Sequence, residues 1–176
     1  MGKAADELEP RIYVACLAAY NSGWLHGRWV TVGDDAEAVW DQIAAMLKAS
    51  PVAGAEEHAI HDHEGFGGVG IAEYASIDAV VAIATFLRAR GRLGVLVVET
   101  LNGDLEAARR ALEEQYHGVF ASLADCFQDL TEETVEIPER LRLYIDYEAM
   151  ARDATLNGEV FTVKTAADEV HVFWAA

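Results

Sequence analysis

The sequence has few cysteines and no long apolar run, and each shortage excludes a class of protein. Its two cysteines, Cys16 and Cys126, lie far apart among 176 residues and match no metal-ligand spacing, so we expect a reduced protein rather than a disulfide framework. No apolar run approaches the roughly 20 residues that span a membrane. The first ten residues lack the apolar core of a signal peptide, and we expect them to form a short flexible tail on a cytoplasmic protein.

Basic side chains are also scarce. Lysine and arginine number 13 against 30 Asp and Glu, which gives a net charge of −17 at pH 7. Such a surface repels nucleic acid, anionic membrane and phosphorylated ligands, and it attracts basic partners. Basic clusters with interleaved aromatic residues, which mark DNA-binding surfaces, are absent. We therefore expect binding to neither nucleic acid nor membrane, although a large negative charge can also serve solubility alone.

The apolar residues, 52% of the chain, predict a folded α+β protein with segregated helices and strands. The expected elements are a hairpin of strands at 11–20 and 24–32, helices at about 36–47, 77–90, 104–116, 122–134 and 138–156, and strands at 159–165 and 169–174. Residues 57–75 are glycine-rich and expected to be irregular. For residues 93–101, propensity favours a strand, but a short apolar run does not exclude a buried helix.

The negative charge is concentrated toward the C-terminal end. Residues 99–176 hold 17 acids and 6 bases, a net charge of −11. The densest stretch, 113–139, has eight acids and no lysine or arginine. The eight are Glu113, Glu114, Asp125, Asp129, Glu132, Glu133, Glu136 and Glu139.

Within that stretch the acids are predicted to occupy one face of a helix. An apolar row at i, i+4, i+7 and i+11 predicts the buried face, and it consists of Leu123, Phe127, Leu130 and Thr134. An acidic row with the same spacing, Asp125, Asp129, Glu132 and Glu136, is offset by two residues, or about 200° of rotation. The acids should therefore point to solvent as one stripe.

An acidic stripe without interspersed lysines favours a binding surface over a solubility device. Like charges at i and i+4 cost a helix a few tenths of a kcal/mol per pair, and a soluble surface usually avoids that cost by mixing signs. Carboxylates four residues apart are separated by about 6 Å, close to the spacing of phosphates along one DNA strand. The average density of the stripe is lower, about one charge per 5 Å against one per 3.4 Å, so a full imitation of DNA needs further acidic patches or a second subunit.

Several strings of the sequence resemble one protein family in the right order. They are IYVACLAAYNSGWLHGRWV at 12–30, GAEEHAIHDHEGF at 54–66, EYASI at 73–77 and IPERLRLYIDYEAMARDATLNGEVF at 137–161. Together they resemble the ArdA antirestriction proteins, and the resemblance covers essentially the whole chain beyond the first ten residues. It implies an elongated α+β molecule of three small subdomains at 11–75, 76–115 and 116–176, with helix rather than strand at 93–101.

The resemblance also implies a function. ArdA proteins come from mobile genetic elements, pair as homodimers, imitate bent B-form DNA and occupy the DNA-binding site of type I restriction-modification enzymes. We therefore expect a non-enzymatic inhibitor without a cofactor or metal. The acids at matching positions are Asp125, Glu132, Glu133, Glu139, Asp146, Glu148 and Asp153. An acidic binding module for another basic protein, such as a nucleoid protein or polymerase, is the alternative.

Two other motifs suggest different chemistry. HAIHDHE at 58–64 brings together His58, His61 and His63 with Asp62 and Glu64, residue types that bind zinc or iron, but their spacing matches no familiar metal motif. GFGGVG at 65–70 satisfies GxGxxG formally. However, it does not follow a buried strand, and Arg88 and Arg90 stand where a dinucleotide site needs an acid, so a series of turns is the favoured interpretation. No GxSxG motif is present.

Overall fold

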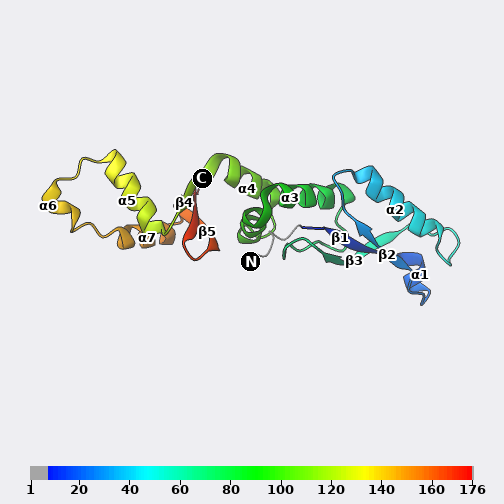
Figure 1. Ribbon diagram of the computed structural model, residues 1–176. Helices are drawn as coiled ribbons and strands as arrows, with labels where there is room; N and C mark the ends of the chain where they lie inside the picture. Colours follow the sequence, from blue (N-terminus) through cyan, green and yellow to red (C-terminus); the bar gives the residue numbers. More distant parts are fainter. Residues whose placement is uncertain (1–7, 176) are drawn as a thin grey trace, which may run out of the picture. The chain divides into compact units, whose positions relative to one another are not determined.

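The structure is a computed structural model that describes residues 8–175 of the chain. It divides into two compact units, residues 1–95 and 96–176, which we call unit 1 and unit 2. The division into three subdomains at 11–75, 76–115 and 116–176 stays a prediction. The flexible tail expected over the first ten residues lies mostly outside the described part. The expected α+β class is confirmed, since each unit combines one three-stranded antiparallel sheet with helices (Figure 1).

Unit 1 is built on a sheet with the strand order β2-β1-β3. The central strand β1 (Arg11–Cys16) pairs antiparallel with β2 (Gly27–Thr31) and with β3 (His58–Glu64). The predicted pairing of 11–20 with 24–32 is confirmed for 11–16 with 27–31, but residues 17–20, expected to continue the first strand, form the short helix α1 (Leu17–Asn21). The expectation that 57–75 is irregular is wrong for residues 58–64, which form β3. The polar residues of this segment hid the strand pattern in the sequence. An edge strand accepts such residues because one of its sides faces solvent.

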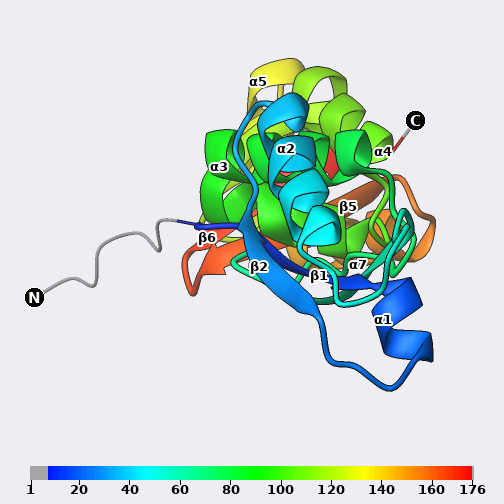
Figure 2. The same ribbon diagram turned by 90° about the vertical axis from the view of Figure 1, so that its right-hand side faces the viewer.

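Helix α2 (Ala36–Lys48) packs on β1 and β2 (Figure 2). It forms where predicted because the Asp35 side chain caps it, accepting a hydrogen bond from the Glu37 backbone N–H. Its buried residues Val39, Ile43 and Met46 follow helical spacing. The core of unit 1 thus lies between this helix and the sheet.

Helix α3 (Ile77–Thr100) consists of two helical stretches separated by Gly91, which has a φ of 54°. Glycine adopts this backbone conformation without the steric strain of a side chain. The predicted end of a helix at this glycine is therefore confirmed. The propensity-based expectation of a strand at 93–101 is wrong, and the helix implied by the family resemblance is found. Val97 and Val98 are fully buried, and this burial explains why β-branched residues appear in a helix here.

Unit 2 contains a second sheet with the strand order β4-β6-β5. The two expected C-terminal strands are β5 (Val160–Ala166) and β6 (Glu169–Trp174). Strand β4 (Tyr116–Phe120) was missed. The helix predicted from Asp104 to about Tyr116 is found and ends at Gln115. It comprises α4 (Leu105–Arg110) and one π-helical turn, η1 (Ala111–Gln115), after which the chain becomes extended.

The helices of unit 2 differ from the prediction at one place. Helix α5 (Leu123–Thr134) forms as expected, but the long helix predicted at 138–156 is wrong. It is divided into α6 (Glu139–Arg142) and α7 (Tyr147–Leu156). The Asp146 side chain starts α7 by accepting a hydrogen bond from the Ala149 backbone N–H, and an Asp cap favours a new helix over continuation of the previous one.

Helices α5 and α7 pack against each other, with α6 in the connection between them (Figure 1). The buried residues of the two helices are small, namely Cys126, Ala151 and Ala154. Among the described residues, Cys16 and Cys126 are both buried and form no disulfide. No helix within residues 8–175 has the length and apolar character needed to cross a membrane.

Candidate functional site

The candidate site is the acidic surface of unit 2. This unit holds 17 acids and 6 bases, whereas unit 1 holds 13 acids and 7 bases. All eleven acids predicted from the sequence are exposed. They lie on η1 (Glu113, Glu114), on α5 (Asp125, Asp129, Glu132, Glu133), in the following connection and on α6 (Glu136, Glu139), and at the start and on the body of α7 (Asp146, Glu148, Asp153).

Helix α5 presents its acids to solvent because of the way in which it begins. The Ser122 hydroxyl accepts a hydrogen bond from the Asp125 backbone N–H at 3.1 Å and donates one to the Asp125 carboxylate at 2.6 Å. This reciprocal capping arrangement fixes the first turn of the helix. Cys126 is then fully buried and Asp129 faces solvent. Burial raises the pKa of the Cys126 thiol to about 11, and the nearby Asp129 charge adds to that effect.

The predicted stripe on α5 needs two corrections. Thr134, assigned to the buried face, is exposed, and the buried face centres instead on Cys126. Glu136 lies beyond the end of the helix, because Val135 has an extended backbone. The helical row of acids therefore ends at Glu132, and the charges from 113 to 139 are distributed over several elements rather than along one continuous helix.

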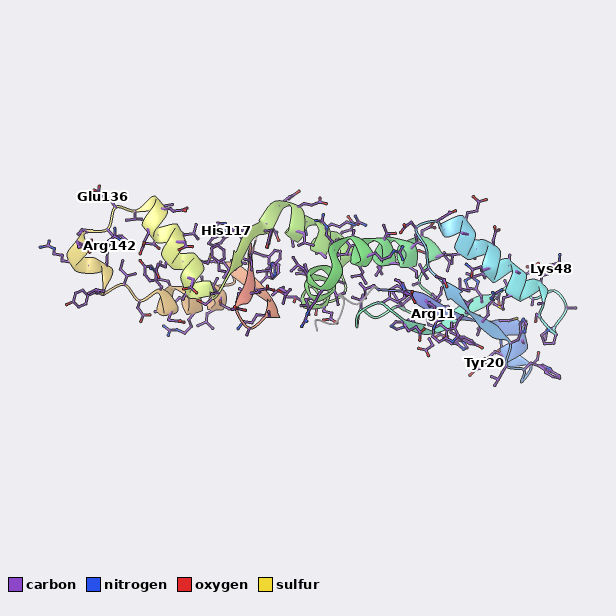
Figure 3. All side chains as sticks on the ribbon, in the orientation of Figure 1. Arg11, Tyr20, Lys48, His117, Glu136 and Arg142 are labelled. Atoms are coloured by element: carbon purple, nitrogen blue, oxygen red, sulfur yellow. The ribbon has the colours of Figure 1, made fainter. Side chains whose placement is uncertain are left out.

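The stripe is also partly compensated, contrary to the sequence-based expectation. Arg142 on α6 lies 3.9 Å from Glu132 and 3.4 Å from Glu139, measured from guanidinium nitrogen to carboxylate oxygen. Figure 3 labels Arg142 and Glu136 at the α6 end of unit 2. The contact depends on the path of the connection between α5 and α6, residues 135–138, and helical spacing alone does not predict that path.

The structure brings three of the predicted acids together. Asp125, Asp146 and Glu148 line a recess of about 490 Å³ between the start of α5 and the start of α7. Gln128 and Tyr144 also line it, and Tyr144 is 84% exposed. Neither residue was predicted from the sequence, although the aromatic residues of LYIDYE could have indicated a binding surface there. A recess with carboxylates and an aromatic ring suits cationic side chains.

Other predicted acids remain apart from this recess. Glu113 and Glu114 lie on η1, before strand β4, and Asp153 is 3.5 Å from Arg152 on the same helix. The site is therefore a broad surface with one recess rather than a single cleft. It can bind basic groups at several points, and no one pair of carboxylates is set apart from the rest as an acid–base pair would be.

The three histidines of the HAIHDHE segment contact aromatic rings from three different parts of unit 1. His58 meets Trp40 edge to face at 5.3 Å between ring centroids, His61 meets Tyr20 at 5.1 Å, and His63 meets Phe66 at 5.9 Å. These separate contacts leave the rings without a common centre. Within residues 8–175 no group of three His, Cys, Asp or Glu is arranged to hold a metal ion.

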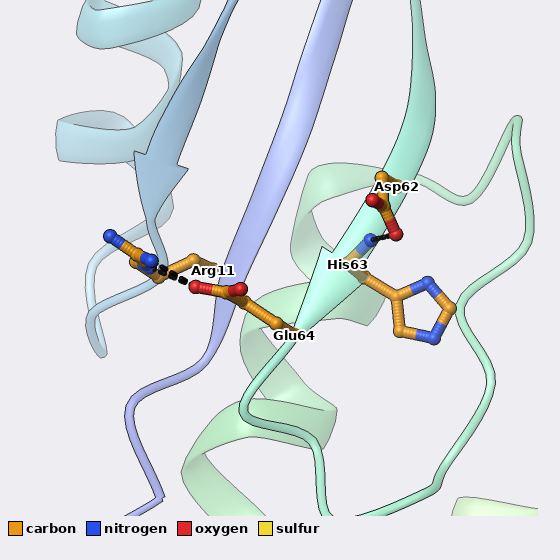
Figure 4. Close-up of polar contacts among 4 residues, drawn as sticks. All are labelled: Arg11, Asp62, His63 and Glu64. Atoms are coloured by element: carbon orange, nitrogen blue, oxygen red, sulfur yellow. Dashed lines mark hydrogen bonds and ion pairs between the residues drawn. The ribbon is translucent and has the colours of Figure 1, made fainter.

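The acids of this segment also have separate contacts (Figure 4). Glu64 pairs with Arg11 on the neighbouring strand, and the Asp62 carboxylate accepts a hydrogen bond from the His63 backbone N–H at 2.8 Å. The His63 ring points away from the Arg11–Glu64 pair. The segment therefore acts as an edge strand of the sheet, and its polar side chains serve local packing and pairing.

The glycine-rich segment at 65–70 forms turns, as predicted. Gly65 has a φ of 76°, and a Cβ at this position would lie 2.0 Å from the Glu9 carbonyl oxygen. Gly67 has a φ of 67° and lies against Val95. The next helix begins only at Ile77, so the segment does not open a helix as a dinucleotide-binding loop does.

Comparison with known proteins gives one family match. The family model described as antirestriction protein (ArdA) matches residues 12–169, which is most of the chain. The comparison with curated proteins gives no match.

Proposed function

Because the chain belongs to the ArdA antirestriction family, we propose that it inhibits restriction by imitating DNA. It binds the DNA-binding site of a type I restriction-modification enzyme in the cytoplasm, as a homodimer and without catalytic chemistry or a cofactor. The observation that carries this proposal is the acidic surface of unit 2, with its net charge of −11 and its eleven exposed acids. A restriction enzyme offers the lysine and arginine side chains that normally contact phosphates, and these are the partners that such a surface attracts.

The spacing of charges supports this proposal. On α5, Asp125 and Asp129 are separated by about 6 Å of helical rise, and Glu132 follows after about 4.5 Å. This regular row is a sparser version of one DNA strand, on which phosphates follow at about 3.4 Å of axial rise. Since the helical row is short, the remaining contacts come from the other elements of unit 2 and from a second copy of the chain.

The test is competition between the protein and DNA for a purified type I enzyme. We expect the protein to displace DNA, and to do so less well when salt rises from about 50 to about 200 mM, because the contacts are electrostatic. An absence of displacement at low salt would contradict the proposal. Displacement of DNA from a nucleoid protein but not from the restriction enzyme would replace the proposed target with another basic protein.

Two variants with equal charge changes separate a specific surface from bulk charge. The unit 2 variant carries Asp125→Asn, Asp129→Asn, Glu133→Gln and Glu136→Gln. The unit 1 variant carries Glu37→Gln, Asp41→Asn, Glu56→Gln and Glu57→Gln, all at exposed positions. Four exposed charge contacts of about 0.2–1 kcal/mol each predict a loss of affinity in the unit 2 variant of about fourfold at least and several hundredfold at most. The unit 1 variant should lose little. Equal losses would mean that net charge alone drives the competition.

A further inference from the structure

Unit 1 has a recess of its own, lined by residues outside the acidic surface of unit 2. It has a volume of about 520 Å³ and lies along β3 and residues 71–73. Ile60 and Ile71 supply its apolar lining, while Tyr20, His61 and Glu73 supply its polar groups. No lysine or arginine is among the described residues that line it. Figure 3 labels Tyr20 on α1.

A bulge in strand β3 places His61 in this recess. Tyr13 pairs with Asp62 and the next residue, Val14, pairs with Ile60, so His61 is the extra residue on β3. A bulge of this kind re-aims the side chain that it carries. The His61 ring meets the Tyr20 ring at an interplanar angle of 82°. This contact holds the Tyr20 ring beside β3, although 54% of the residue stays exposed.

Glu73 also lies beside His61. Its carbonyl oxygen accepts a hydrogen bond from the Ile60 backbone N–H at 2.9 Å, which fixes its position beside β3. Its carboxylate lies 4.0 Å from His61 Nε2 and is half exposed. The carboxylate also accepts a hydrogen bond from the neighbouring Tyr74, and this bond raises the pKa of the Tyr74 hydroxyl. Glu73 thus presents a negative charge beside His61, and the His61 ring in turn contacts the exposed Tyr20 ring.

The lining of this recess selects a ligand that is cationic and partly apolar. Asp62 and Glu73 repel anions, so a phosphate or nucleotide is excluded. A cation beside a carboxylate and an aromatic face gains both ion pairing and cation–π attraction. The half-buried Ile71 offers an apolar surface to an aliphatic stem. A side chain that combines a cationic head with such a stem fits every part of the lining.

We propose that this recess binds an arginine side chain of a protein partner, with its guanidinium group paired to Glu73 and its planar face near the exposed Tyr20 ring. Arginine fits better than lysine because its guanidinium is planar, weakly hydrated and able to stack on an aromatic ring. The inference rests on the proposed function for the identity of the partner, whose DNA-binding surface supplies the arginine. The chemistry of the recess stands apart from that identity.

The test is a titration of the intact protein with N-acetyl-arginine amide, followed by NMR. We expect saturable shifts at Tyr20, His61 and Glu73, with binding about tenfold weaker for the neutral isostere N-acetyl-citrulline amide and weaker also for N-acetyl-lysine amide. Glu73→Gln should lose about the same factor. Glu56→Gln, which removes an exposed charge of unit 1 outside the recess, should bind as the unchanged protein does.

Equal shifts with arginine and citrulline would overturn the inference, and so would arginine-induced shifts that persist in Glu73→Gln. These outcomes differ from those that test inhibition of restriction. If the protein displaces DNA from the enzyme but shows no arginine binding at Tyr20, only the recess assignment fails. If arginine binds in the recess but DNA is not displaced, the proposed function fails and the recess remains a guanidinium site.

Discussion

The two units of the molecule share an architecture but differ in how they pair their charges. In unit 1, arginines reach acids far away in the sequence. Arg11 pairs with Glu64 across the sheet, and Arg88 pairs with Asp34. Hydrogen bonding to Arg88 holds the pKa of the Asp34 carboxyl below its usual value. In unit 2 the ion pairs mostly join near neighbours, as in Arg109 with Glu106 and Arg152 with Asp153. Arginine–acid pairs in unit 1 therefore connect different elements, whereas much of the charge in unit 2 stays exposed at the surface.

The cores of the two units also differ, in the size of the side chains that they bury. Unit 1 buries large side chains completely, including Ile12, Ile43, Phe66 and Leu87. The packed helices α5 and α7 of unit 2 bury mainly cysteine and alanine, and Phe173 on β6 is the large anchor of the sheet. Small side chains let two helices approach closely and bury less apolar area. Unit 2 therefore gains less stability from its helices and depends strongly on its sheet.

The largest expected effect is the loss of stability when Phe173 is removed from the core of unit 2. Phe173→Ala removes a fully buried ring that stacks on Phe161 at 4.7 Å between centroids. We expect the free energy of unfolding of unit 2 to fall by about 3–5 kcal/mol. Hydrogen exchange measured by mass spectrometry should show lost protection in residues 96–175 and unchanged protection in 8–95. The matched variant Ile43→Ala should do the reverse. Equal loss of exchange protection over both units would show that they unfold together, and the proposed difference between their stabilities would then be wrong.

The sequence predicted those parts of the fold that depend on local signals. The caps at Asp35 and Ser122 were recognisable because a capping residue stands directly before a periodic apolar row. Strands β3 and β4 were missed because they lie at sheet edges, where polar residues and glycine are accepted, and only pairing with a distant strand defines them. The strand assigned by propensity at 93–101 was wrong because burial in a helix overrides that propensity.

The candidate site was predictable to a similar degree. The exposure of the acids on α5 followed from helical spacing alone, since an offset of two residues places them opposite the apolar row. The contact of Arg142 with Glu132 and the recess at Asp125 and Asp146 did not follow. The contact depends on the path of residues 135–138 between α5 and α6. The recess depends on the division of 138–156 into two helices, and one capping hydrogen bond at Asp146 accompanies that division.

A smaller effect separates the two roles proposed for Asp146. Asp146→Ala removes the cap of α7 and should lower the stability of unit 2 by about 1 kcal/mol, measured by urea unfolding. Asp146→Asn keeps an oxygen acceptor and should stay near the original stability. Both variants remove one exposed charge, so each should weaken competition with DNA by less than about fivefold.

The cap of α2 in unit 1 provides the matched control for Asp146. Asp35→Ala should cost a similar stability, because Asp35 accepts a similar bond from Glu37, but it should leave competition with DNA almost unchanged. If Asp35→Asn weakened competition as much as Asp146→Asn, the Asp35 carboxylate would contribute to binding as much as that of Asp146. The proposed concentration of charge contacts in unit 2 would then be wrong.

The smallest expected effect concerns pH and the histidine that packs on α2. Burial lowers the pKa of His58 below its ordinary value, because desolvation disfavours the charged ring. The unfolded chain therefore binds a proton at a higher pH than the folded chain. The stability that the neutral ring contributes is complete above about pH 6.5 and is lost as pH falls from there toward the lowered pKa. His58→Phe keeps a ring against Trp40 and removes this titration.

Exchange protection measured at about pH 7.5 and about pH 5.5, after correction for the intrinsic rate, tests this effect within each unit. In the unchanged protein, unit 1 should lose stability at the lower pH, and in His58→Phe that loss should shrink. Unit 2 should keep its own acid loss in both proteins, since burial also lowers the pKa of His171, against a smaller opposing effect of Glu169. A change confined to unit 2, or an equal acid loss of unit 1 in both proteins, would show that the environment of His58 is not what links unit 1 to pH.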